Sequence, residues 1–470
     1  MKLNLSFGTY FTSILTALFF VFVLVFSSGN SNLSIPVLIE RHNLVAKIVY
    51  FILVFSPIVL LFFSKTWKNT ISTPRKILLV GLAAFLASTF YSARYGINSG
   101  GLFLACSLFF AISQRRIYKP NNVYYWFWAY LLIHIISLFW TIDLHEGLNE
   151  LRVYLLFFTF PLAFCFFQLT EEEIDRLLLL FFRTATIFVF VSLFCWIYES
   201  TRMDIPLTEW FGIHKKMFAD QTSYSIVFNW VGYDHPSYIS LGYNLALAVG
   251  IYLLGKRNTQ SKINILELTL FAIFAFILTV LIQSRVGLVN FIIVAIFGIA
   301  WLLRKEKKYL YGFICLCFIL AVIVLVKLDY ISKFSHDPIR YQQYETAIFY
   351  IRSHPWLGTG IGGMANIMTS NELALKLGYP LASDINIYPS NQFLGDLMQT
   401  GVFGLISLTG MLCFIIYYCI KQRNWVLFSL IITFLILMLI EMPFFLLKGT
   451  TLFVPMTCLL LQMQYRKKNE

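Results

Sequence analysis

The chain alternates between apolar stretches and short polar connections, and this pattern is interrupted by one long polar interval. An α-helix needs about 17–25 apolar residues to cross a hydrocarbon core of roughly 30 Å. Fourteen stretches are candidates: about 9–28, 45–63, 77–93, 99–113, 123–140, 151–169, 177–199, 236–254, 264–282, 286–303, 309–326, 391–420, 425–441 and 448–464. The pattern therefore predicts an all-α polytopic membrane protein with about 12–14 transmembrane helices.

Composition supports this class, because 59% of the residues are hydrophobic and only 13% are charged. The net charge of +13 raises the question of a nucleic-acid partner. More than half of the 36 lysines and arginines, however, fall in one set of alternate short loops, as the positive-inside rule expects of cytoplasmic connections. We therefore predict that both termini are cytoplasmic and that no nucleic acid binds.

The same alternation places the long polar interval, residues 327–390, on the outer face. It divides the chain into N-terminal membrane helices (1–326), a long outer loop (327–390) and C-terminal membrane helices (391–470). Apolar positions recur at helical spacing around 344–351 and 372–377, which predicts one or two short helices lying along the membrane.

Arginines on the outer side are the first candidates for chemistry. Arg285 lies at a tight corner between two predicted helices, where a guanidinium could clamp a lipid-linked diphosphate or could simply reach the headgroups. Arg340 and Arg352 are twelve residues apart in the outer loop. If that segment is helical, we expect about three turns between them and both side chains on roughly the same face. Solvated loop charges are the alternative.

Other polar residues occur at the predicted outer surface. His235 and Tyr238 flank the proline that opens the span at 236–254 and are candidates to orient sugar hydroxyls. Asn391 and Gln392 open the span at 391–420, where Ser390 or Asn391 also suits a helix N-cap. Asp396, one turn further, is expected to pair with an arginine or to act as a base.

A glycine cluster, GTGIGG at 358–363, follows His354 and satisfies the letters of a dinucleotide-binding motif. That motif needs a preceding strand and a helix packed on a parallel sheet, and neither fits this interval. We expect instead a flexible loop that turns back toward the membrane.

Four segments in order resemble the O-antigen ligase and O-antigen polymerase superfamily: GYDHPSYISLGYNLALAV, LIQSRVGLVNFIIVAIFGI, IRYQQYETAIFYIRSHPWLGTGIGG and YPSNQFLGDLMQTGVFGLISL. The resemblance covers about residues 230–420 and extends to the N-terminal helices only in general character. It implies a fold like that of C-type glycosyltransferases, with a long periplasmic loop and a periplasmic active site in the bacterial inner membrane. The implied substrates are a glycan linked to undecaprenyl diphosphate and an acceptor glycan or glycolipid.

The resemblance also implies roles for particular residues. The family's arginine at the outer helix corner corresponds to Arg285, and its loop arginine corresponds to Arg340. Where the family usually has His-Asn before the long helix, this chain has Ser390-Asn391. His354, Asp396 and His235 are candidates to replace that histidine; the alternative is that the good diphosphate leaving group makes a base dispensable.

The expected activity is an inverting transfer that uses no metal and no cofactor. Because the histidine associated with ligases is absent, a polymerase is the first choice. An O-antigen ligase is second, and a pilin-type protein oligosaccharyltransferase is third. The alternative from a different class is a flippase or other transporter of lipid-linked oligosaccharides. It is disfavoured because the polar groups gather at one surface and no inverted repeat is visible.

Overall fold

The computed structural model describes residues 56–58, 72–90, 93–202, 236–256, 263–282, 284–304, 338–364 and 389–463. Within these ranges the side chains at 56, 93–96, 194–202 and 338–342 are not described. Every regular element in the described ranges is a helix, and none is a strand. The predicted all-α architecture is confirmed.

The helices follow the predicted apolar stretches closely. They are η1 (Ser56–Ile58), α6 (Thr73–Ser88), α7 (Ala93–Gln114), α8 (Asn122–Ser137), η2 (Leu138–Trp140), α9 (Leu144–Tyr154), α10 (Leu156–Phe164), α11 (Glu171–Arg202), α15 (Pro236–Gly255), α16 (Ile265–Leu281), α17 (Arg285–Leu303), α20 (Pro338–Ser353), α23 (Gln392–Gln422), α24 (Trp425–Met438) and α25 (Leu447–Leu461). The predicted spans at 9–28 and 309–326 lie outside the described residues, and only η1 is described within 45–63.

Six of the described helices are long and apolar enough to cross a membrane: those at Ile97–Gln114, Asn122–Trp140, Glu171–Leu193, Pro236–Gly255, Arg285–Leu303 and Gln392–Gln422. Three shorter apolar helices, α16, α24 and α25, accompany them. The chain is therefore a multi-pass membrane protein, as its apolar pattern predicted.

The stretch at 151–169 differs from its prediction as a single span. It contains the end of α9, a break at Leu155 and the nine-residue α10. At 1.5 Å per residue α10 is only about 14 Å long, less than half of a hydrocarbon core. The apolar pattern gave no sign of the break, because the residues on both sides of Leu155 belong to one continuous apolar run.

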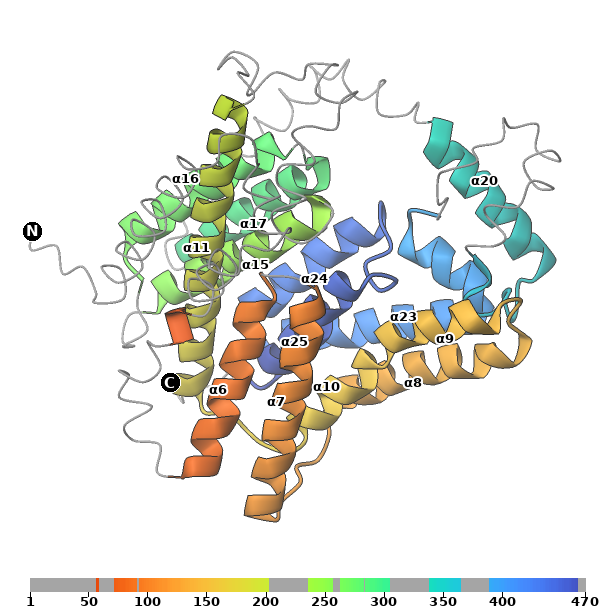
Figure 1. The fold of residues 1–470 in the computed structure, drawn as a ribbon, viewed down its shortest axis with the longest axis horizontal. Helices are drawn as coiled ribbons and strands as arrows, with labels where there is room; N and C mark the ends of the chain where they lie inside the picture. The colour runs from red at the N-terminus through yellow and green to blue at the C-terminus, as the bar shows by residue number, and fades with distance from the viewer. Residues whose placement is uncertain are drawn as a thin grey trace, which may run out of the picture. The chain divides into compact units, whose positions relative to one another are not determined.

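The chain forms two compact units whose sequences interleave, Met1–Ile117 with Phe166–Gly298, and Tyr118–Cys165 with Ile299–Glu470. In the first unit α6 lies along α7, and α11 packs against α6, α15 and α16 (Figure 1). Helices α11 and α15 are buried almost all round, whereas α7 keeps one apolar face exposed. The division into 1–326, 327–390 and 391–470 concerns membrane topology and stays a prediction.

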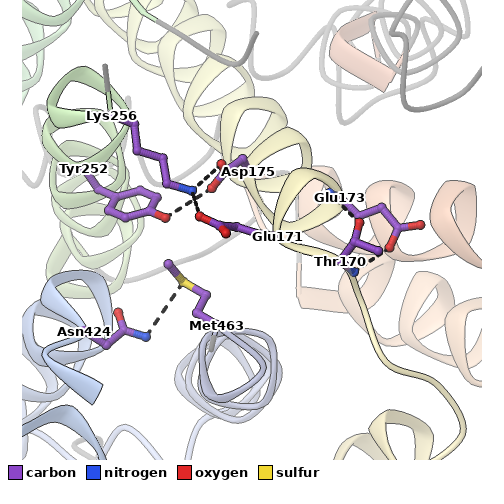
Figure 2. Close-up of polar contacts among 8 residues, drawn as sticks. All are labelled: Thr170, Glu171, Glu173, Asp175, Tyr252, Lys256, Asn424 and Met463. Carbon is purple, nitrogen blue, oxygen red and sulfur yellow. Dashed lines mark hydrogen bonds and ion pairs between the residues drawn. The ribbon is translucent and has the colours of Figure 1, made fainter. Parts of the chain in front are cut away.

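An ion-pair network ties the polar ends of α11 and α15 together (Figure 2). Lys256 pairs with Asp175, which is 1% exposed, and with Glu171 at 2.7 Å. Tyr252 donates from its hydroxyl to Asp175 at 3.2 Å. At the start of α11, Thr170 and Glu173 exchange hydrogen bonds between side chain and backbone as a capping box. The acidic first turn of α11 thus has cationic and backbone partners.

In the second unit α8 lies along α23, and α10 packs against α8 and α25 (Figure 1). The core is aromatic: rings of Phe127, Phe157, Phe434, Phe444 and Phe453 contact one another with centroids 4.7 to 6.3 Å apart. Edge-on and tilted contacts dominate, as aromatic quadrupoles favour. This core supports the polar groups described below.

Candidate functional site

Arg285 is the first residue of α17, and its side chain is exposed. Ser284 caps the helix, because its Oγ accepts from Gly287 N at 3.0 Å and its carbonyl accepts from Leu288 N at 2.9 Å. Arg285 is therefore the first residue after a helix cap. The positive end of the helix dipole lies at the same place.

The backbone behind Arg285 is held by α15. Asn244 Nδ2 donates to Gly287 O at 2.9 Å, and the hydroxyls of Ser240 and Ser284 are 3.1 Å apart. A Cβ at Gly287 would lie 2.4 Å from Ser240 Oγ, so only glycine allows this approach. The first turn of α17 is thus fixed against a buried polar surface.

Arg340 lies in the first turn of α20, and its side chain lies outside the described residues. The prediction of a helix around 344–351 is confirmed by α20, and the second predicted helix, at 372–377, lies outside the described residues. Arg352 is exposed in the last turn of α20. Ideal helix geometry puts positions 340 and 352 about 120° apart around the axis of α20. Because the side chain of Arg340 is not described, the expectation that the two arginines share a face stays a prediction.

Residues 354–363, which we call the glycine loop, follow α20 and lie against α23. Thr359 N donates to Met398 O and Gly360 N donates to Gln399 O, each at 2.9 Å, and Val402 N donates to Pro355 O at 3.0 Å. In an unbroken helix Val402 N would pair with Met398 O. Each of these two groups is bonded to the loop instead.

This exchange of partners depends on a kink in α23 at Gly401, whose φ of 65° and ψ of −160° are not helical. A Cβ at Gly401 would lie 2.1 Å from Trp356 O, and one at Gly362 would lie 2.1 Å from Gly147 N. Gly362 also has a positive φ, of 86°. The glycines of GTGIGG therefore serve close backbone packing, and the loop is extensively hydrogen-bonded where flexibility was expected.

Asp396 lies one turn inside α23 and is completely buried. Its Oδ2 accepts from the hydroxyl of Tyr130 at 2.8 Å, and its Oδ1 accepts from Gln392 Nε2 at 2.9 Å. Gln392 Oε1 in turn accepts from Phe444 N at 2.9 Å. The hydrogen-bond partners of the Asp396 carboxylate among the described residues are thus a phenol and an amide, whereas an arginine partner or a role as a base was expected.

Glu150 is a second buried carboxylate, on α9, and it contacts the glycine loop. Its Oε2 accepts from Gln399 Nε2 at 2.7 Å and from Gly362 N at 3.1 Å. Burial raises the pKa of Glu150 from its ordinary value of 4.5 to about 7, and Glu146 adds to this rise while the two hydrogen bonds oppose it. α9 is not among the described helices that could cross a membrane.

The remaining predicted residues are distributed as follows. His354 is exposed at the start of the glycine loop, and Tyr238 is buried in α15 with 3% of its surface exposed. Asn391 is the N-cap of α23, since its side chain accepts from Leu394 N at 3.1 Å, which confirms that prediction. His235 lies outside the described residues.

Within the described ranges, no group of three or more histidine, cysteine, aspartate or glutamate side chains is arranged to hold a metal ion. The metal-independent mechanism remains a prediction, since it concerns the reaction rather than this observation.

Residues 270–409 match the family model described as "Wzy_C: O-Antigen ligase". This match covers under a third of the chain and supports the resemblance of that segment to the O-antigen ligase and polymerase superfamily. The matched segment includes most of α16, all of α17 and α20, the glycine loop and α23 as far as Thr409. No curated protein matches the chain. The superfamily implies a membrane glycosyltransferase that acts on a lipid-linked glycan and an acceptor.

Sequence reasoning missed Glu150, Gln399 and Tyr130 as parts of the arrangement around the matched segment. Gly147, Glu150 and Tyr154 lie at helical spacing and form the buried face of α9. A carboxylate on a buried helix face needs a partner, but the burial of this face is known only from the structure, so the spacing alone does not single out Glu150. No comparable pattern marks Gln399, whose partner is 249 residues away in sequence.

Proposed function

We propose that this protein is an inverting, metal-independent glycosyltransferase that moves a glycan from undecaprenyl diphosphate to an acceptor sugar hydroxyl at the periplasmic face. Its most specific assignment is a polymerase of O-antigen or exopolysaccharide repeat units. The observation that carries the proposal is the exposed Arg285 at the capped start of α17, inside the segment that matches the family.

The placement of arginines supports an anion-binding role. A cation in the first helical turn opposes the helix dipole, at a cost of about 0.3–1 kcal/mol near a surface. Arg285 and Arg340 both occupy first turns. A diphosphate would reverse this cost, because it attracts both the guanidinium and the helix N-terminus. Arg352, in a last turn, is ordinarily placed, so in this proposal it assists the acceptor rather than the diphosphate.

The chemistry then needs little covalent participation by the protein. The acceptor oxygen bonds to the anomeric carbon as the bond from that carbon to the diphosphate oxygen breaks, with inversion. Arginines neutralise the charge that grows on the leaving diphosphate. The exposed His354 can take the proton of the acceptor hydroxyl, or the diphosphate can take it. Asp396 is buried and already accepts two hydrogen bonds, so we assign it to orienting the start of α23.

Two observations bear on polymerase against ligase. Ser390 stands where the family usually has histidine, and a serine hydroxyl is no base near neutral pH, which favours a polymerase. The match to a family described as O-antigen ligase favours the second candidate. Under either assignment His235, Tyr238, Asn391 and Gln392 stay proposed contributors to the substrate site, although Tyr238 is buried and Asn391 caps α23.

The test uses a strain that lacks the chromosomal gene and carries plasmid variants. Loss of the protein should leave one repeat unit on the lipopolysaccharide core if it is a polymerase, and long chains stranded on the lipid carrier if it is a ligase. Arg285→Ala should abolish product while the membrane level of the protein, measured by immunoblot, is unchanged. Arg285→Lys should rescue poorly because lysine lacks the planar fork.

Arg304 provides a matched control, because it is exposed and directly follows the other end of α17. Its guanidinium lies over the ring of Trp301 at 3.8 Å, so Arg304→Ala removes an arginine next to the opposite end of α17 without touching the proposed clamp. A wild-type amount of product in Arg285→Ala would refute the proposed function. Equal losses of product in Arg285→Ala and Arg304→Ala would show that the effect is not specific to the proposed clamp.

A further inference from the structure

Glu150 lies outside the family segment in sequence, yet it contacts two parts of that segment. One carboxylate oxygen, Oε2, accepts from the glycine loop at Gly362 N and from α23 at Gln399 Nε2. The side chain is 9% exposed. A buried acceptor shared by two donors on different elements fixes those elements to each other, because either donor loses a partner if they separate.

Gln399 contacts the glycine loop through its backbone and Glu150 through its side chain. Its backbone carbonyl accepts from Gly360 N at 2.9 Å while its side-chain amide donates to Glu150. Its Oε1 is buried and has no hydrogen-bond partner among the described residues. The orientation of the amide is therefore decided by Glu150, since the flipped amide would place an oxygen against the carboxylate.

The glycine loop is continuous with the C-terminal end of α20. Gly358 N donates to His354 O and His354 N donates to Tyr350 O, both at 3.0 Å. Ala347 of α20 also packs with Met364 and Met398 in a buried cluster. Fixing the loop on α23 therefore fixes the direction in which α20 leaves it.

We propose that Glu150 is a positioning residue for the transfer reaction. With Gln399 it holds the glycine loop on the kink of α23, and in this way it sets the placement of α20 and of the arginines on that helix. The inference rests on the proposed function, because it gives α20 a role in binding the substrates.

The variants separate anchoring from charge. Glu150→Gln keeps a carbonyl oxygen that can accept from both Gly362 N and Gln399 Nε2, whereas Glu150→Leu keeps the approximate volume and removes the acceptor. Glu146→Leu is the matched control. Glu146 lies one turn earlier on α9, is only half buried and has no side-chain hydrogen bond to the loop within the described part of the chain.

Docking of the loop can be measured without any glycan. Gly363 is buried, and a Cβ there would make only ordinary contacts, 3.6 Å from Ile142, so Gly363→Cys fits the docked loop. We expect a membrane-impermeant maleimide to react about fivefold faster or more with this cysteine in Glu150→Leu than in the Glu150 parent. The rate should be unchanged in Glu150→Gln and Glu146→Leu. The protein without Gly363→Cys gives the background from native cysteines.

Activity is then compared in the same four proteins, with glycine restored at 363. Glu150→Leu should lower turnover at least about tenfold, and Glu150→Gln should restore most of it. Unchanged labelling in Glu150→Leu overturns the anchoring. Faster labelling with normal turnover overturns the positioning role, and a Glu150→Gln variant as inactive as Glu150→Leu overturns the assignment to hydrogen bonding. If the proposed function is wrong, Arg285→Ala makes normal product. The difference in labelling between Glu150→Leu and the parent is then still expected, so the two failures can be told apart.

Discussion

Tyr130 donates from its hydroxyl to Asp396 Oδ2 at 2.8 Å, and both side chains are completely buried. The pair joins α8 to the first turns of α23, where the glycine loop also docks. A buried carboxylate is tolerated only when donors compensate for its lost hydration. The stability of this part of the second unit therefore depends on the tyrosine hydroxyl.

Tyr130→Phe removes that hydroxyl and leaves Gln392 as the donor to the Asp396 carboxylate among the residues that the structure describes. We expect a loss of about 1.5–3 kcal/mol in stability, seen as a lower melting temperature of the purified protein in detergent. Tyr417→Phe is the control, because Tyr417 lies on the same α23 and is 53% exposed. An equal melting temperature for Tyr130→Phe and the parent would show that the hydrogen bond does not support the fold.

In the ion-pair network around Lys256, we expect the pair with buried Asp175 to contribute more to stability than the pair with exposed Glu171. Lys256→Ala leaves Asp175 buried without its cation, and we expect a loss of roughly 3–5 kcal/mol. Glu171→Gln should cost less than about 1 kcal/mol, because the Glu171 side chain is 70% exposed and its pair is screened by solvent. Adding Asp175→Asn to Lys256→Ala should recover part of the loss. Thermal unfolding of the four proteins tests the ranking, and similar losses for both single variants would contradict it.

Glu150 should make stability depend on pH. Its pKa is about 7 in the folded protein, above the ordinary 4.5, because burial disfavours the carboxylate. The folded state therefore binds this proton more tightly than the unfolded state does. The resulting stabilisation is full below pH 4.5 and is lost as pH rises through about 7, with an upper limit of about 3 kcal/mol. Melting temperatures measured from pH 4.5 to 8.5 should fall more steeply in the parent than in Glu150→Gln. Parallel curves would exclude Glu150 as the titrating group.

Glycine at the kink should be far less replaceable than glycine on an open helix face. Gly401→Ala introduces a Cβ at 2.1 Å from Trp356 O and a strained positive φ, so we expect at least about 1–3 kcal/mol of destabilisation. Gly101→Ala, on the exposed side of α7 with nothing within 4 Å, should be neutral or stabilising by up to about 1 kcal/mol. Melting temperatures in one detergent compare the two, and equal effects would mean that the kink is not required.

The apolar pattern was sufficient for the helices because membrane length and apolar composition are local properties. It placed α15 and α17 to within one residue at each end. It failed at 151–169, where composition does not change although the helix breaks at Leu155. The sequence offered Ser390 or Asn391 as the cap of α23, and Asn391 is the cap; this was predictable because capping is also local, governed by one side chain and the next turn.

The site was less predictable because its contacts are distant in sequence. Nothing near Asp396 indicates Tyr130, which lies 266 positions earlier. The glycine cluster indicated an unusual backbone, but its docking requires a second glycine, Gly401, on another element. The shared face expected of Arg340 and Arg352 treats twelve residues as a whole number of turns, and it stays a prediction because the side chain of Arg340 is not described. The roles of Arg285 and Arg340 stay predictions.

The kink at Gly401 gives α23 two ways to satisfy the same pair of backbone groups. With the loop docked, Met398 O and Val402 N are bonded to Thr359 and Pro355. In a straight helix they would bond to each other, and glycine adopts either backbone conformation readily. The kink therefore leaves neither Met398 O nor Val402 N without a partner, because the docked loop supplies the hydrogen bonds that the bend removes from the helix. Loss of the loop contacts would leave both groups unpaired unless α23 straightened at Gly401.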